Sequence, residues 1–168
     1  MENMTLRLSG IVGDSIVDGK GIRMTVFTQG CPHHCPGCHN PHTHDFKGGY
    51  DETLESVLNK FLSDPLQCGV TLSGGEPFCQ AKALAELCRE VHRHNKNVWA
   101  YSGYTFEEIF EGKVPHGMEL LEQVDVLVDG RFVLEERDLN LLFRGSRNQR
   151  LIDVKASFAA EKAVELAL

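Results

Sequence analysis

The sequence predicts an α/β protein of one domain, residues 1–168, built as an incomplete parallel (β/α) barrel of about five or six strands. Two observations support this prediction. Short apolar segments with strand character are followed repeatedly by segments with the 3.6-residue periodicity of amphipathic helices. Such alternation is typical of parallel β/α units joined by right-handed crossovers. The strand candidates are too few to close an eight-stranded barrel.

Five segments are expected to form strands. They are RMTVFTQG (23–30), CGVTLS (68–73), NVWAYS (97–102), VDVLVDG (124–130) and RLIDVKAS (150–157). Distinctive polar or glycine-rich residues follow the first four of them, namely a cysteine-rich loop, SGGEP (73–77), SGY (102–104) and Asp129-Gly130. Because the carboxyl ends of parallel strands meet at one edge of a sheet, these four segments are expected to form one site.

Helices are expected between these strands. Residues 51–63 place apolar side chains on one helical face, at Leu54, Val57, Leu58, Phe61 and Leu62. A second helix, from about Gln80 to His94, carries a similar stripe, and TFEE (105–108) has the Thr-x-x-Glu pattern of a capping box. An Ala-rich helix is expected after the last strand. The sequence therefore predicts a helix after most of the strands.

Composition narrows the classes of function. The chain is 42% hydrophobic and 24% charged, which suits a globular domain with a sizeable core. A net charge of −7 disfavours nucleic-acid binding, and no apolar segment is long enough to span a membrane. The start MENMTLRLSG lacks the features of a signal peptide, so a cytoplasmic location is expected. In a reducing compartment, closely spaced cysteines indicate metal or redox chemistry.

Residues 30–40, GCPHHCPGCHN, place Cys31, Cys35 and Cys38 in one loop. Three thiolates can hold three irons of a four-iron, four-sulfur cluster and leave the fourth iron open. The same loop could instead bind zinc, with His39 or His42 completing the ligand set, or its thiols could be structural. Cys68, Cys79 and Cys88 are expected to be ordinary buried thiols.

Residues 19–40, GKGIRMTVFTQGCPHHCPGCHN, resemble the signature of the radical S-adenosylmethionine activating enzymes that install glycyl radicals. The matching positions are Gly19, Gly21, Arg23, Phe27, Gly30, Cys31, Cys35, Cys38 and Asn40, and SGGEP supplies a second motif. The short chain and the CPHHCPGCHN form are most similar to the activators of the anaerobic ribonucleoside-triphosphate reductase. The family often has an aromatic residue where this chain has Gly37.

This resemblance implies a 4Fe-4S cluster on Cys31, Cys35 and Cys38, whose open iron is chelated by the methionyl group of S-adenosylmethionine. Reductive cleavage then gives a 5′-deoxyadenosyl radical. The resemblance assigns the methionyl amino group to Gly74, Gly75 and Glu76. It implies further cofactor contacts at Gly37, Cys38 and His39, with His39 expected to supply the planar surface. Asp129 and Lys155 are expected at the same mouth, where they contact the ligand or pair with each other.

The resemblance also implies the partners. The substrate would be a glycine of the large subunit of the anaerobic ribonucleotide reductase, and the electron would come from a donor such as a flavodoxin. Three alternatives remain open at this point: an activator of pyruvate formate-lyase, a radical enzyme acting on a small molecule, and a zinc-binding module. The Arg-rich segment FRGSRNQR (143–150) could attract an acidic partner.

Overall fold

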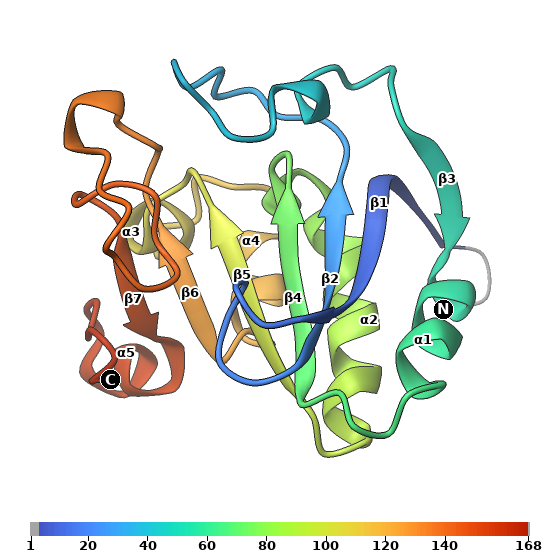
Figure 1. Cartoon of the computed structure of the whole chain (residues 1–168). Coiled ribbons are helices and arrows are strands. Elements are labelled where there is room, and N and C mark those ends of the chain that lie inside the picture. Colours follow the sequence, from blue (N-terminus) through green and yellow to red (C-terminus); the bar gives the residue numbers. More distant parts are fainter. Residues whose placement is uncertain (1–3, 168) are drawn as a thin grey trace.

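One mixed sheet of seven strands organises the protein, in the order β3-β1-β2-β4-β5-β6-β7 (Figure 1). This computed structural model describes residues 4–167. The strands are β1 (Thr5–Ser15), β2 (Arg23–Thr28), β3 (Tyr50–Thr53), β4 (Gly69–Gly74), β5 (Asn97–Ser102), β6 (Val126–Asp129) and β7 (Arg150–Asp153). Strands β2, β4, β5 and β6 run parallel to one another, while β1, β3 and β7 pair antiparallel at the two sides.

Helices cover one face of this sheet, as Figure 1 shows for α2 behind β2. The α-helices are α1 (Leu54–Leu62), α2 (Ala81–Arg93), α3 (Phe106–Phe110), α4 (Gly117–Leu121) and α5 (Val154–Ala160). Short 3-10 helices are η1 (Pro41–Thr43), η2 (Pro77–Gln80) and η3 (Leu134–Glu136). None of the helices within residues 4–167 combines the length and the apolar character needed to cross a bilayer.

The two faces of the sheet differ in chemistry because side chains alternate along a strand. Val70 and Leu72 of β4 belong to the large core shared with the helices. Trp99 of β5 and Val128 of β6 belong to a separate, smaller cluster on the opposite face. Thr71, between the two core residues of β4, accepts a hydrogen bond there from a buried arginine. The opposite face is therefore partly polar, and it is covered by loops instead of helices.

The open α/β architecture expected from the sequence is confirmed, with differences at both edges. Strands β1 and β3 were not expected, because β1 is interrupted by glycines and β3 has the polar sequence YDET. The last strand was expected to run parallel, yet β7 runs antiparallel to β6. The connection over residues 130–149 contains only the short η3, so no crossover helix returns the chain to the opposite edge.

Candidate active site

A cavity of about 380 Å³ opens at the carboxyl edge of the parallel strands. The four segments expected to converge all contribute to it: the cysteine loop, Ser73–Gly75, Ser102–Gly103 and residues after β6. Two further segments complete the wall, Val17–Asp18 before β2 and residues 141–145 before β7. Its size falls in the range of ordinary small-molecule sites. Segments that are far apart in sequence thus form one candidate site.

All three cysteines of the loop line this cavity as free thiols. Cys31 is buried, and Cys35 and Cys38 are partly exposed. The backbone N–H of Asn40 donates a hydrogen bond of 3.4 Å to Sγ of Cys38. Within residues 4–167, no group of three His, Cys, Asp or Glu side chains converges as a ligand set for one metal ion. A four-iron cluster takes each thiolate on a different iron, so thiols that line one cavity without meeting at one point fit it.

The thiols differ in environment. Burial raises the pKa of Cys31, and the backbone of His33 opposes that shift. Because the thiolate is the metal ligand, iron must displace the Cys31 proton. Cys88 is fully buried as expected, and burial raises its pKa. The expectation of buried thiols was wrong for Cys68, which directly precedes β4, and for Cys79, which lies in the short η2; both are exposed.

The glycine pair of SGGEP packs against the segment that leads into the cysteine loop. Gly74 has φ of +95°, and a Cβ there would lie 2.4 Å from the backbone nitrogen of Thr28. A Cβ at Gly75 would lie 2.4 Å from the carbonyl oxygen of Gly30, directly before Cys31. Gly75 also lines the cavity. Close backbone packing therefore requires these glycines, in addition to the ligand approach expected from the sequence.

Glu76 lies below the cavity and does not line it, with its side chain fully buried. Its Oε1 accepts hydrogen bonds from Gly103 N–H (2.7 Å) and His33 Nε2 (2.7 Å). Its Oε2 accepts from Phe78 N–H (3.0 Å) and Ser102 Oγ (2.9 Å). The sequence suggested a carboxylate presented to an ammonium group, whereas this carboxylate is directed at the protein itself.

Position 37 is a glycine instead of an aromatic residue, and neighbouring rings lie beside the third cysteine. Gly37 has φ of +75°, and a Cβ there would lie 2.8 Å from a methyl group of Leu134. The rings of His39 and Phe132 lie 5.1 Å apart, and both side chains line the cavity beside Cys38. A flat surface next to Cys38 is therefore available from His39, as expected, together with Phe132.

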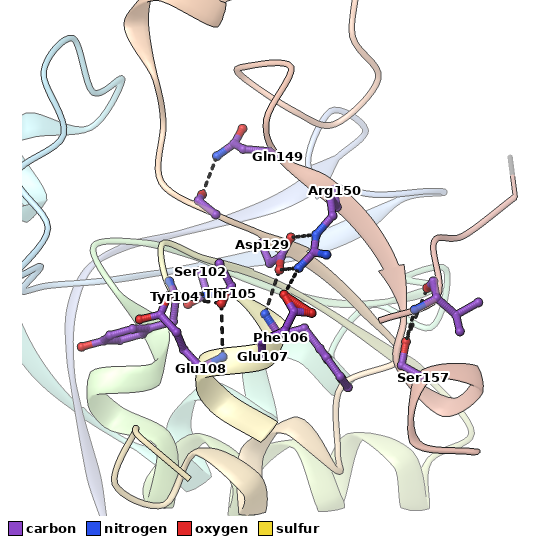
Figure 2. Close-up of polar contacts among 12 residues, drawn as sticks. Ser102, Tyr104, Thr105, Phe106, Glu107, Glu108, Asp129, Gln149, Arg150 and Ser157 are labelled. Carbon is purple, nitrogen blue, oxygen red and sulfur yellow. Dashed lines mark hydrogen bonds and ion pairs between the residues drawn. The ribbon is translucent and has the colours of Figure 1, made fainter. Parts of the chain in front are cut away.

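Asp129 is buried at the end of β6 and is held by the protein (Figure 2). Its Oδ2 accepts from the N–H of Phe106 at 2.7 Å, and Arg150 donates to both of its oxygens, at 2.6 and 3.0 Å. The bond to Asp129 raises the pKa of Arg150. Lys155 was expected beside Asp129, and this was wrong: β7 is antiparallel, so Lys155 follows its far end and Arg150 takes that place.

The upstream part of the signature lies at the opposite end of β2. Arg23 is fully buried there and donates to Thr71 Oγ1 (2.7 Å), Lys20 O (3.0 Å) and Val70 O (3.0 Å). Its guanidinium lies 5.5 Å from the ring centre of Trp99, and burial lowers the pKa of Arg23 to about 10. A Cβ at Gly19 would lie 2.9 Å from the Arg23 side chain. These residues of the signature therefore contribute to the packing of the chain itself.

Comparison with known proteins identifies the family. Residues 17–152 match the model of the 4Fe-4S single cluster domain. The anaerobic ribonucleoside-triphosphate reductase-activating protein of Haemophilus influenzae is 34% identical over 80% of this chain and 89% of its own length. The protein of the same name from Vibrio cholerae is 37% identical over the same shares. The chain belongs to this family of reductase-activating proteins.

Similarity to a solved structure extends to the fold. The crystal structure of QueE from Escherichia coli superposes with a TM-score of 0.52 at 17% identity, covering 62% of this chain and 54% of that chain. The open α/β sheet of this chain therefore has a counterpart in a solved structure.

Several residues of the site were not predicted from the sequence. His33 carried no prediction of its own, although its side chain is only 4% exposed. Phe132, Arg144 and Tyr101 were not considered as cavity residues. The only available signal was position, since Tyr101 precedes the end of a predicted strand and Phe132 follows the end of another by two residues.

Proposed function

We propose that this chain activates the anaerobic ribonucleoside-triphosphate reductase by forming a glycyl radical on its large subunit. The observation that carries the proposal is the set of three free thiols lining one cavity with the SGGEP edge, in a chain of this family. Cys31, Cys35 and Cys38 would hold the 4Fe-4S cluster. When bound, the reduced cluster would supply the electron for cleavage of S-adenosylmethionine, so that hydrogen could be abstracted from a glycine of the large subunit by a 5′-deoxyadenosyl radical.

Residues of this chain would bind and orient S-adenosylmethionine. Arg131 and Arg144 line the cavity and are cationic groups suited to the methionyl carboxylate. The backbone at Gly74 and Gly75 forms the edge beside the cysteine loop, where the methionyl amino group would bind. His39 and Phe132 offer the flat surface for adenine. The helix-covered core behind the sheet excludes water from that side.

A protein substrate agrees with the border of the cavity. Ile16 and Val17, directly before Asp18, are 69% and 70% exposed. Leu139 and Leu142 flank the cavity residue Leu141 and are 80% and 59% exposed. Exposed apolar side chains beside an opening are typical of protein contact sites. A segment of the reductase would cover this border and close the cavity to solvent during hydrogen abstraction.

The test is anaerobic reconstitution with iron and sulfide, followed by reduction and addition of S-adenosylmethionine with the reductase large subunit. We expect 5′-deoxyadenosine and a glycine-centred doublet in electron paramagnetic resonance. Cys35→Ala should give neither. This experiment uses a chemical reductant. In a second experiment, a flavodoxin should replace the chemical reductant as the electron donor. We place this reaction in the cytoplasm.

A parallel sample with pyruvate formate-lyase decides between the two partner proteins. We expect no doublet on the lyase. A doublet on the lyase and none on the reductase would overturn the partner assignment while leaving the radical chemistry intact. Protein that binds stoichiometric zinc and never yields 5′-deoxyadenosine would refute the proposal as a whole.

A further inference from the structure

His33 occupies a socket built from residues of two other loops. Its Nε2 lies 2.7 Å from Oε1 of Glu76, and both side chains are almost completely buried. A Cβ at Gly103 would lie 2.4 Å from the His33 ring, so only glycine leaves room for the imidazole there. The ring of Tyr104 meets the imidazole edge-on, with centroids 4.6 Å apart. One side chain of the cysteine loop is therefore enclosed by the SGGEP segment and the loop after β5.

The same carboxylate joins these segments to one another. Ser102 and Gly103 donate to Glu76 from the end of β5, and the backbone N–H of Glu76 donates to Gly30 O at 2.8 Å. Two backbone N–H groups already fill one acceptor position on each oxygen of Glu76. Because both oxygens of Glu76 act as acceptors, Nε2 of His33 is the donor in the hydrogen bond between His33 and Glu76. His33 is the one residue between Cys31 and Cys35 that enters this network.

We propose that His33 is a positioning residue that holds the cysteine loop against the cofactor-binding edge through Glu76. The inference rests on the proposed function, since it concerns the same site. A buried hydrogen bond to a carboxylate is stronger than one between neutral groups. The bond fixes the segment between the first two cysteines relative to Gly75 and Gly103, and so sets the place of the cluster ligands beside the S-adenosylmethionine edge.

Two substitutions that differ by one methylene separate this role from simple packing. In His33→Gln the amide nitrogen can reach the position of Nε2 and donate to Glu76. In His33→Asn the amide is too short to do so. Glu76→Gln changes the other partner of this hydrogen bond. In either orientation of the new amide, its NH2 group faces a backbone N–H donor, so one acceptor is lost. An exposed pair of the same types, His116 and Glu119 at 3.1 Å, supplies the matched control, His116→Asn.

The first measurement uses metal-free protein and amide hydrogen exchange. In His33→Asn and Glu76→Gln we expect the hydrogen-bonded amides of Cys31 and Cys38 to exchange about ten-fold faster, as for a lost hydrogen bond to a charged group. His33→Gln and His116→Asn should match the wild type. Equal exchange in His33→Asn and the wild type would overturn the proposal whatever the function of the protein. Wild-type protein that holds no cluster would instead refute the proposed function and leave this result standing.

The second measurement uses the reconstituted, reduced protein and follows the change in its electron paramagnetic resonance spectrum on titration with S-adenosylmethionine. We expect the Kd to rise about ten-fold in His33→Asn and to return to within two-fold of wild type in His33→Gln. If His33→Gln is as weak as His33→Asn, the hydrogen bond is not the means of positioning. Circular dichroism of each variant identifies any that fails to fold, and Glu76→Gln then takes the place of His33→Asn.

Discussion

The two ends of β2 carry the two halves of one sequence signature, and they differ in what completes them. Arg23 and Thr28 lie roughly 17 Å apart, at about 3.3 Å per residue. At the Arg23 end, each nitrogen of the buried guanidinium described above donates to an acceptor within the protein. At the Thr28 end, the loop that follows directs three thiols into a cavity. The first half is completed by folding, whereas the second half leaves its thiols free at the cavity.

This difference shows that the residues of one signature should be divided into structural residues and residues of the site before roles are assigned to them. Gly19 and Arg23 belong to the recognition pattern as firmly as the cysteines do, yet they contact only the chain itself. Glu76 also contacts only the chain itself, although it lies close to the site and acts on it by holding the cysteine loop. Substitutions at the two ends should therefore affect different quantities: stability at one end, and iron and ligand binding at the other.

The largest effect is expected from the cysteines. Replacing Cys31, Cys35 or Cys38 by Ala should reduce the iron content from about four per chain to near zero, because each thiolate holds a different iron. Iron analysis and absorption spectra of anaerobically purified protein measure this. Cys88→Ala, inside the core, should cost about 1 kcal/mol of stability and retain the iron. Variants that keep a full cluster would show that the loop is not the ligand set.

Gly75→Val should come next, and it tests the contact between SGGEP and the cysteine loop. The new side chain would displace Gly30, so iron retention and S-adenosylmethionine binding should fall together, with a packing cost of about 1–3 kcal/mol. Gly10→Val is the control, because nothing lies within 4 Å of a Cβ there. Full iron retention with loss of nucleotide binding alone would mean that the ligand, and not Gly30, sets the need for glycine.

Arg23→Met should lower the free energy of unfolding by about 2–3 kcal/mol, because it leaves buried oxygens without donors. Iron bound per folded chain should be unchanged. Urea denaturation of the metal-free protein measures the loss, and the exposed Arg93→Met should stay within about 0.5 kcal/mol of wild type. A specific loss of iron in folded Arg23→Met would remove the distinction between the two ends of β2.

Arg150→Gln should have the smallest effect, about 1 kcal/mol of stability, because Asp129 keeps its bond from Phe106 and Arg150 is partly exposed. The Kd for S-adenosylmethionine should not change. Calorimetry of wild type and variant measures both quantities. A Kd raised ten-fold or more would instead support the original expectation that Asp129 contacts the cofactor.

Much of the fold could be predicted because it depends on local pattern. The helix expected over residues 80–94 is found at Ala81–Arg93, and the strand expected over 97–102 is found with those bounds. The capping box at Thr105 is present with both of its hydrogen bonds. The direction of β7 could not be predicted locally, since it depends on how residues 130–149 return to the sheet.

The site was predictable where residues act through their own chemistry, and less so where they act through neighbours. Three closely spaced cysteines in one loop indicate candidate metal ligands from the sequence alone, and all three line the cavity. The hydrogen bonds of Glu76 join it to residues 26, 27 and 43 positions away in the sequence. No local pattern indicates such partners, and for this reason a carboxylate in a glycine-rich turn suggested a ligand contact.

The antiparallel direction of β7 has a consequence for how such a protein can diversify. Residues 130–149 leave and rejoin the sheet at the neighbouring positions Asp129 and Arg150, which are held together by their ion pair. Lengthening a loop whose ends are already fixed costs little, about 0.6 kcal/mol for each doubling of a flexible segment. Insertions and deletions can accumulate in its outer part, between η3 and Leu141, without disturbing the strands or the cavity residues at its two ends. A change in this outer part can alter the exposed border that a protein target would meet, while the cavity itself stays the same.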